Sequence, residues 1–240
     1  MVDRISKTFE ARVLDEHKIA FISSVNNENE YAVCKNAISR LIVPNGYQVE
    51  ILAVINAKSM TEAYTKGMNA SDAKYKIYLH QDVFCINTKL ISNLLEIFQS
   101  NSSIGMIGLA GSASLSHEWP VWWNAPKEHL FGCVLHRICS KNKIVKDCYG
   151  EVPGGQGDYI SVAAIDGLFM ASQYDLPWRT DLFHGWHFYD ISQSREFINA
   201  GYDVVIPHYD KPWCIHDCDI KPIGDSYYEN MEIFKNYYSW

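Results

Sequence analysis

The first hundred residues of this 240-residue chain alternate between short apolar runs and segments with helical periodicity. The apolar runs, each bounded by turn-forming residues, cover residues 19–25, 49–55, 76–79 and 104–109. The helical segments between them cover residues 29–43, 60–70 and 90–98. Strands that alternate with helices of this length indicate βαβ units, whose right-handed crossovers place helices against the sheet. The pattern predicts an α/β fold with a mostly parallel central sheet and helices on both faces.

The regular alternation stops after residue 110. Residues 111–159 are rich in Trp, Gly and Pro, and we expect either an inserted lid on the acceptor side or a passive surface excursion. Further elements are expected as strands over 162–171, 202–207 and 212–217 and as helices over 190–200 and 227–238. No repeat or composition shift marks a second domain, so a single domain over residues 1–240 is predicted.

Composition excludes several classes of function. The formal net charge is −7, so nucleic acid is a poor candidate partner. No apolar run approaches the ~18 residues that span a bilayer, and the first residues lack a signal-peptide core, so no transmembrane segment and a cytoplasmic location are expected. The C-terminal helix carries an aromatic side that we expect to pack on the core or on a second copy in a homo-oligomer.

The seven cysteines form no dense framework, and their number is odd. This pattern predicts reduced thiols rather than disulfide partners. Cysteines flank His136 and His216, but neither spacing is the CxxC of a zinc knuckle, so a structural zinc site is the less favoured alternative.

The chemistry-bearing residues begin with Asp82, which stands where a short apolar strand ends, two residues after His80. Side chains at i and i+2 of a strand point the same way, so both could face one ligand. Ligands bind at the carboxyl edge of such sheets, and an ionised carboxylate there needs water, a donor or a metal. The alternative is that Asp82 only caps a helix or turns the chain.

Three further features extend this candidate site. Asp166 precedes Gly167, and a glycine there would let the backbone approach a bound group closely. Asp190 enters a predicted helix, where it could act as a base or, with Gln193 three residues later, only cap that helix. His216 could join Asp82 on a diphosphate-bound Mg²⁺ or Mn²⁺, or be a structural histidine.

Together these motifs resemble a known family. The series runs from the strand ending in His-Gln-Asp, through the Asp-Gly strand and the sequence GWHFYD over 185–190, to AGYDVVIPH over 200–208. It is similar to glycosyltransferase family 2-like proteins of GT-A fold over roughly residues 19–216. The StrF-type branch, named for a streptomycin-biosynthesis domain, looks closest. The resemblance implies a nucleotide-sugar-binding half over 19–110, an acceptor-side half over 111–220 and a C-terminal helix over 221–240.

The resemblance also implies roles for the metal and donor side of the site. His80 and Asp82 stand where relatives carry the Asp-x-Asp motif for metal and nucleotide sugar, and His216 matches a late histidine that completes the metal shell. Ser23 and Val25 match the loop that cradles the nucleobase.

The resemblance implies roles for four more positions in the same way. Asn56 stands where relatives usually have an acid for base or ribose. Asp166 and Gly167 correspond to the donor-sugar and acceptor side, and Asp190 to the general base of inverting members.

The expected activity is therefore metal-dependent, inverting transfer of a sugar from a nucleoside-diphosphate donor, with UDP favoured. The acceptor would be a hydroxyl of a saccharide or glycoside, and the cofactor Mn²⁺ or Mg²⁺. His80 and Asn56 depart from the family pattern and leave open a degenerate nucleotide- or sugar-binding module. A sugar nucleotidyltransferase is less favoured, because residues 23–27 lack the glycine and lysine of a phosphate loop.

Overall fold

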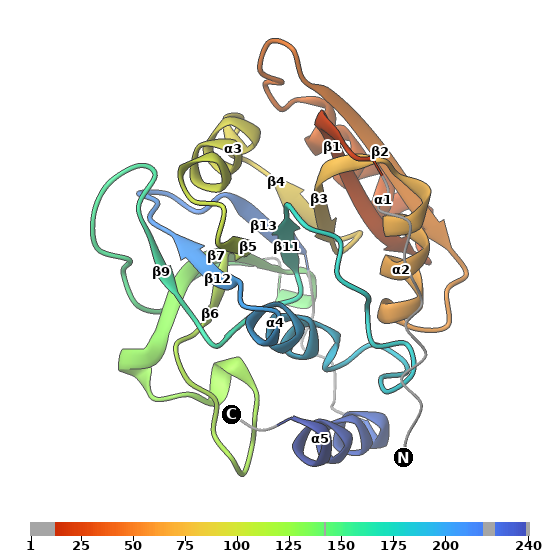
Figure 1. The fold of residues 1–240 in the computed structure, drawn as a ribbon, viewed down its shortest axis with the longest axis vertical. Helices are drawn as coiled ribbons and strands as arrows, with labels where there is room; N and C mark the ends of the chain where they lie inside the picture. The colour runs from red at the N-terminus through yellow and green to blue at the C-terminus, as the bar shows by residue number, and fades with distance from the viewer. Residues whose placement is uncertain (1–12, 142, 218–223, 239–240) are drawn as a thin grey trace.

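The computed structural model describes residues 13–141, 143–217 and 224–238. Two sheets and their flanking helices form the molecule (Figure 1). The seven-stranded sheet has the spatial order β2 (Gln48–Ile55), β1 (Asp15–Val25), β3 (Ala73–Leu79), β11 (Phe169–Ser172), β5 (Ile104–Gly108), β12 (Asp203–Pro207) and β9 (Tyr159–Ser161). Strands β2, β1, β3, β5 and β12 run in one direction, whereas β11 and β9 run against them.

A smaller six-stranded sheet lies beside the first. Its order is β10 (Ala164–Ile165), β6 (Ala110–Ser112), β7 (Leu130–Ile138), β13 (Cys214–Asp217) and β4 (Val83–Cys85), with β8 (Lys143–Cys148) paired to β7. Strand β4 follows β3 directly in the chain, and β13 pairs with it in antiparallel register. A late segment of the sequence is thereby brought next to the carboxyl end of β3.

Helices cover both faces of the larger sheet, as predicted. In the described part of the chain the α-helices are α1 (Glu28–Ser39), α2 (Met60–Ala70), α3 (Leu90–Ser100), α4 (Tyr189–Asn199) and α5 (Asp225–Tyr237). Short 3-10 helices in the same part of the chain are η1 (Trp122–Asn124), η2 (Lys127–His129) and η3 (Cys139–Lys141). Side chains alternate across a strand. Accordingly, Phe21 of β1 packs in a core with α1 and α3, and Ile22 in another with α2 and α4.

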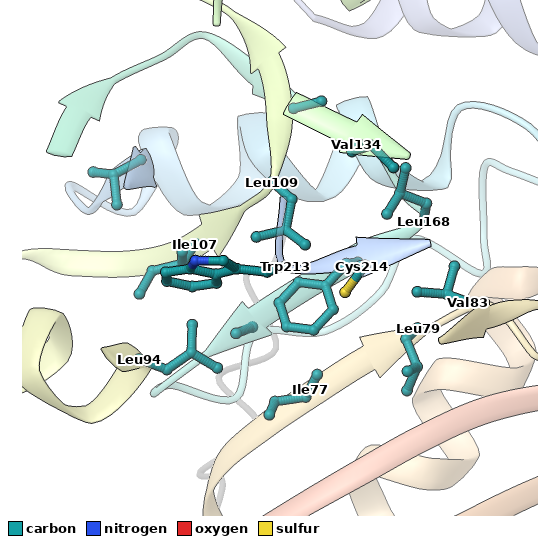
Figure 2. Close-up of a cluster of buried hydrophobic side chains, with 14 of the residues drawn as sticks. Ile77, Leu79, Val83, Leu94, Ile107, Leu109, Val134, Leu168, Trp213 and Cys214 are labelled. Atoms are coloured by element: carbon teal, nitrogen blue, oxygen red, sulfur yellow. The ribbon is translucent and has the colours of Figure 1, made fainter. Parts of the chain in front are cut away.

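The larger core lies between the two sheets. Figure 2 shows Ile77 and Leu79 of β3 and Cys214 of β13 pointing into one cluster, together with Leu94 of α3. Each of these four side chains is at most 3% exposed. At roughly 25 cal/mol per Å² of buried apolar surface, such packing is the main force that holds the second sheet against the first.

Residues 111–159 form neither a lid nor a passive excursion over most of their length. Strands β6, β7 and β8 lie there and build the second sheet, because β7 gains a parallel partner in β13 and an antiparallel one in β6. The glycine-rich stretch over 149–158 is a loop. The single strand expected over 162–171 was also wrong. The chain turns at Gly167 and splits it into β10 and β11, which belong to different sheets.

The expectation that all cysteines are reduced is contradicted. Cys133 and Cys148 form a disulfide between β7 and β8, where the hairpin register places them directly opposite each other. Cys34, Cys85 and Cys214 are free and buried. The disulfide removes one argument for a reducing compartment, since thiols there stay reduced.

The C-terminal helix packs on the chain itself. Tyr227, Met231, Phe234 and Tyr238 are each at most 7% exposed, and Phe234 lies 5.7 Å from the Phe188 ring between centroids. The aromatic side that suggested a partner surface is thereby covered. Among the described residues, no helix combines the length and apolarity needed to cross a bilayer.

Candidate functional site

A cleft of about 550 Å³ opens at the carboxyl ends of β1 and β3. Its walls come from the end of β1, the β3–β4 connection, the start of α2, η1, the segment before α4 and helix α5. This is the edge at which α/β sheets bind ligands, and the size suits a small-molecule ligand. A larger groove of about 770 Å³ lies between the start of α3 and residues 208–213, but it contains no cluster of metal-ligating side chains among the described residues.

The cleft contains His80 and Asp82, and His216 lies against them. His80 and Asp82 follow β3, and His216 arrives from β13, where its backbone pairs with Val83 of β4. The nearest imidazole nitrogens of His216 and His80 lie 3.5 and 3.9 Å from Asp82 Oδ1. One ligand atom from each of the three residues lies within 4.8 Å of the others.

The electrostatics of the cluster suit a divalent cation. Asp82 Oδ1 is buried and makes no hydrogen bond to any described residue. Burial is the largest influence on the pKa of Asp82 and raises it, but His216 and His80 together hold the pKa below its ordinary value. Burial, and then His216, lower the pKa of His80, so its ring stays neutral and can use a lone pair.

The spacing of these atoms agrees with a shared ion. Two ligands on opposite sides of a small divalent cation lie about 4.2 Å apart, twice a bond length of about 2.1 Å. The observed separations of 3.5 and 3.9 Å from Asp82 Oδ1 fall inside that limit, and the ligand atoms of all three residues lie within 4.8 Å of one another. The residues present therefore fit a metal ion bound by one carboxylate and two imidazoles.

Gln81, between the two motif residues, has a structural task that the sequence did not reveal. Its Oε1 accepts hydrogen bonds from the amides of Asn26 and Asn27, at 2.9 and 3.0 Å. Asn27 in turn caps helix α1 through its side chain. The β1–α1 loop is thus tied to the motif and held at the edge of the cleft.

The Asp-Gly motif and Asp190 meet on the other side of His80. The Asp166 carboxylate accepts from Leu168 N at 2.8 Å, and that of Asp190 from Gly167 N at 3.1 Å. Burial, and then the charge of Asp166, raise the pKa of Asp190 to about 7. The space above Gly167 is filled by the Tyr189 ring rather than open to a ligand, which corrects the expected reason for this glycine.

Asp190 is not the cap of its helix. Helix α4 begins at Tyr189, and its N-cap is Phe188, with a positive φ of 64° and no side-chain capping bond. Gln193 donates instead to Leu176 O. The alternative of a capping pair is therefore wrong, and a half-buried carboxyl group with a pKa near neutrality can exchange protons at physiological pH.

Several predicted site residues are not among those that line the cleft: the binding residues Ser23, Val25, Asn56, Asp166 and Gly167, and the predicted base Asp190. Ser23 and Val25 are buried at 1% and 3% exposure, because alternation along β1 turns them inward. Ser24, between them, lines the cleft instead. Asn56 is exposed at the end of β2 with a positive φ of 59°, a conformation that Asn tolerates, and it too lies outside the cleft lining.

Two tryptophans border the same cleft. Trp123 and Trp186 are 47% and 46% exposed, whereas Tyr189 is a core residue at 4%. Large aromatic faces left open beside polar groups are typical of ligand sites.

The comparisons with known proteins agree with this architecture. The sequence profile of a "Glycosyltransferase like family" matches residues 20–238. The chain belongs to this glycosyltransferase-like family. Membership confirms the expected family-level resemblance. No curated protein sequence matches the chain.

Solved structures share the GT-A fold at low sequence identity. One is mannosyltransferase PcManGT from Pyrobaculum calidifontis in complex with GDP-Man and Mn²⁺, at 10% identity and TM-score 0.50, covering 83% of this chain and 56% of that one. Another is a Drosophila beta-1,4-galactosyltransferase 7 mutant with manganese, UDP-Gal and xylobiose, at 12% identity and TM-score 0.50. The match covers 83% of this chain and 70% of that one. A third is GalNAc-T7 with UDP, GalNAc and Mn²⁺, at 9% identity and TM-score 0.55. The match covers 85% of this chain and 44% of that one. The family member described here thus spans 56% of the first of these chains.

Proposed function

We propose that this glycosyltransferase-family protein is a metal-dependent, inverting enzyme. Its donor would be a nucleoside-diphosphate sugar, with UDP favoured, and its acceptor a hydroxyl of a saccharide or glycoside. The observation that carries the proposal is the cluster of His80, Asp82 and His216 around one buried carboxylate oxygen at the cleft. The three compared proteins hold Mn²⁺, and two of them carry UDP or a UDP-sugar, which supports the same cofactor and nucleotide here.

Asp82 and His216 would hold the ion, with His80 as a third ligand. A bound divalent cation would offset the negative charge that develops on the leaving diphosphate. Mg²⁺ prefers oxygen ligands in strict octahedral geometry, whereas imidazole binds later divalent metals more readily. Two histidines beside one carboxylate therefore favour Mn²⁺ over Mg²⁺.

Asp190 would act as the general base. In the proposed step, the acceptor hydroxyl oxygen attacks the anomeric carbon and the bond from that carbon to the diphosphate oxygen breaks. The hydroxyl proton passes to an Asp190 oxygen, and the nucleoside diphosphate leaves with the bonding electrons. Attack on the face opposite the leaving group inverts the anomeric configuration. A pKa near 7 supports the assignment, because a base works best when its pKa lies near the working pH.

The two halves of the chain would divide the substrates. Residues 19–110 would bind the donor, with Ser24 in place of Ser23 and Val25 at the cleft. Residues 111–220 would bind the acceptor, with Trp123 and Trp186 as aromatic walls, while α5 supports the cleft through Tyr227. Asp166 would help to set the protonation of Asp190, since its charge raises that pKa.

Placement in the StrF-type branch belongs to the same proposal and rests on the motif series alone. The sequence-based reason to expect a homo-oligomer no longer holds, because the aromatic side of α5 is covered within the chain. A cytoplasmic location stays a prediction, and the Cys133–Cys148 disulfide weighs against it.

The proposal is tested by incubating the protein with Mn²⁺, a panel of UDP- and GDP-sugars and a mixture of glycoside acceptors, and measuring free nucleotide and glycoside product. We expect one donor to give acceptor-dependent nucleotide release that Asp82→Ala abolishes. Release that Asp82→Ala leaves unchanged would contradict the proposed site. Binding of a donor without release would favour the degenerate binding module.

A further inference from the structure

Tyr189 contacts the metal-ligand cluster without belonging to it. Its hydroxyl oxygen lies 2.5 Å from His80 Nε2, while Nδ1 of the same ring faces Asp82 Oδ1 at 3.9 Å. An imidazole binds a metal through a nitrogen that carries no proton, and its other nitrogen then donates a hydrogen bond. The contact with Tyr189 therefore leaves Nδ1 as the nitrogen that faces Asp82, with Nε2–H donating to the tyrosine oxygen.

The structure fixes Tyr189 in this place. The side chain is 4% exposed and its ring meets that of Tyr64 edge-on, with centroids 5.8 Å apart. On its other side it lies over Gly167, where any Cβ would collide with the hydroxyl and the ring. The hydroxyl thus has a defined position, and the backbone at residue 167 keeps the approach to His80 clear.

We propose that Tyr189 is a positioning residue of the metal site, whose hydroxyl orients the His80 ring so that Nδ1 faces the ion. This inference rests on the proposed function, because it requires that His80, Asp82 and His216 bind a metal. A carboxylate can present either of two equivalent oxygens, but an imidazole that flips presents a different nitrogen at a different place. A histidine at position 80 therefore needs a second partner, and Tyr189 supplies it.

The same turn of α4 couples this partner to the proposed base. Tyr189 reaches His80, and Asp190, the next residue, accepts from the Gly167 amide. One short segment thereby sets the orientation of a metal ligand and the position of a carboxylate. The Asp-Gly turn before β11 serves both, because the Gly167 amide donates to Asp190 and the missing side chain leaves room for Tyr189.

The test is Tyr189→Phe, which removes one hydroxyl and keeps the ring. Mn²⁺ affinity is measured without nucleotide, from the electron paramagnetic resonance signal of free Mn²⁺. Loss of a partner that orients a ligand typically costs about 10–100-fold in metal affinity, and we expect a loss of that size. The apparent KM for Mn²⁺ should rise to match, while kcat at saturating Mn²⁺ stays near the wild-type value.

Tyr64→Phe is the matched control. Tyr64 is also buried and its ring meets that of Tyr189 edge-on, but its hydroxyl has no hydrogen-bond partner among the described residues. We expect it to leave Mn²⁺ affinity unchanged. An equal loss in both variants would mean that core packing, not the hydroxyl, controls the site, and would overturn the inference.

A second comparison uses His80→Ala. If Tyr189 acts through His80, then Tyr189→Phe has no further effect on Mn²⁺ affinity once His80 is removed, and the two changes are not additive. Additive losses would overturn the inference. Asp82→Ala distinguishes the proposed metal site from the proposed positioning role. If Asp82→Ala weakens Mn²⁺ binding but Tyr189→Phe does not, the metal site stands and the positioning role is wrong. Wild type that binds no Mn²⁺ contradicts both.

Discussion

The Asp190 carboxylate accepts a hydrogen bond from the Gly167 amide, with 3.1 Å between Oδ2 and N. This bond joins the first turn of α4 to the turn between β10 and β11, two strands that belong to different sheets. It holds the carboxyl group in place, and burial beside Asp166 raises its pKa to about 7. A rigid carboxyl group that titrates near neutrality is what base catalysis requires.

Replacing Asp190 by Asn should abolish most sugar transfer. The amide keeps the size of the carboxyl group and can accept from Gly167 N, but it cannot take a proton. A positioned base contributes about 10²–10⁴-fold in rate, so kcat should fall within that range while nucleotide affinity changes little. Asp225→Asn, at the exposed start of α5, is the control and should retain wild-type kcat. Wild-type transfer by Asp190→Asn would show that another group is the base.

The same variant should be more stable than wild type at high pH. Asp190 has a folded pKa near 7, above its ordinary value of 3.8, so its ionisation opposes folding and stability is lost as pH rises through 7. Since the site is partly open to solvent, we expect a gain in unfolding free energy of about 1–2 kcal/mol at pH 8 and less at pH 5. Urea denaturation at both pH values measures the difference. A gain that is equal at both would contradict the raised pKa.

The rate of transfer should depend on pH through the same carboxyl group. With Asp190 as base, kcat/KM rises with pH and levels off above about 7. Asp166→Asn removes a neighbouring negative charge, which lowers the pKa of Asp190 and moves the rise to lower pH. Steady-state kinetics between pH 5 and 9 on both proteins provide the check. An unshifted profile would show that Asp166 does not set the protonation of Asp190.

Reduction of the disulfide should destabilise the fold without removing the site. Cys133 and Cys148 close a short loop with a sequence separation of 15, for which loss of the cross-link costs about 3 kcal/mol. We expect Cys133→Ala/Cys148→Ala to lower the free energy of unfolding by roughly 2–3 kcal/mol and to retain Mn²⁺ binding. Equal denaturation midpoints with and without dithiothreitol for the wild type would show that the bond does not form in solution.

The sequence predicted the first half of the fold well because its signals are local. Helix α2 has the predicted bounds, since Ser59 caps it and accepts a hydrogen bond from Glu62 N at its start. Helix α1 ends at Ser39, earlier than predicted, because Leu41 turns back into the core. Strands β7 and β8 were missed, since their pairing with each other and with β13 depends on contacts remote in the sequence.

The candidate site shows the same contrast between residues with local sequence signals and residues whose role depends on contacts remote in the sequence. His80 and Asp82 could be found because they end a predicted buried strand. His216 could be found as a metal-ligating residue near the end of the ordered core, a choice that the family resemblance then supported. Tyr189 could not be found, since its partner His80 lies 109 residues away in the sequence. Ser23 was chosen over Ser24 because the side of β1 that faces the cleft depends on the helices packed against it. The disulfide was missed because it depends on the register of an unpredicted hairpin.

The central claim is that Asp82 and His216 hold a metal ion that binds a nucleoside diphosphate. Calorimetric titration of UDP and GDP, each without metal, with Mn²⁺ and with Mg²⁺, on wild type and on Asp82→Ala tests it most directly. We predict that one nucleotide binds only when Mn²⁺ is present, that Mg²⁺ supports weaker binding, and that Asp82→Ala loses this binding. Nucleotide binding that is equal without metal, or equal in Asp82→Ala, would contradict the account.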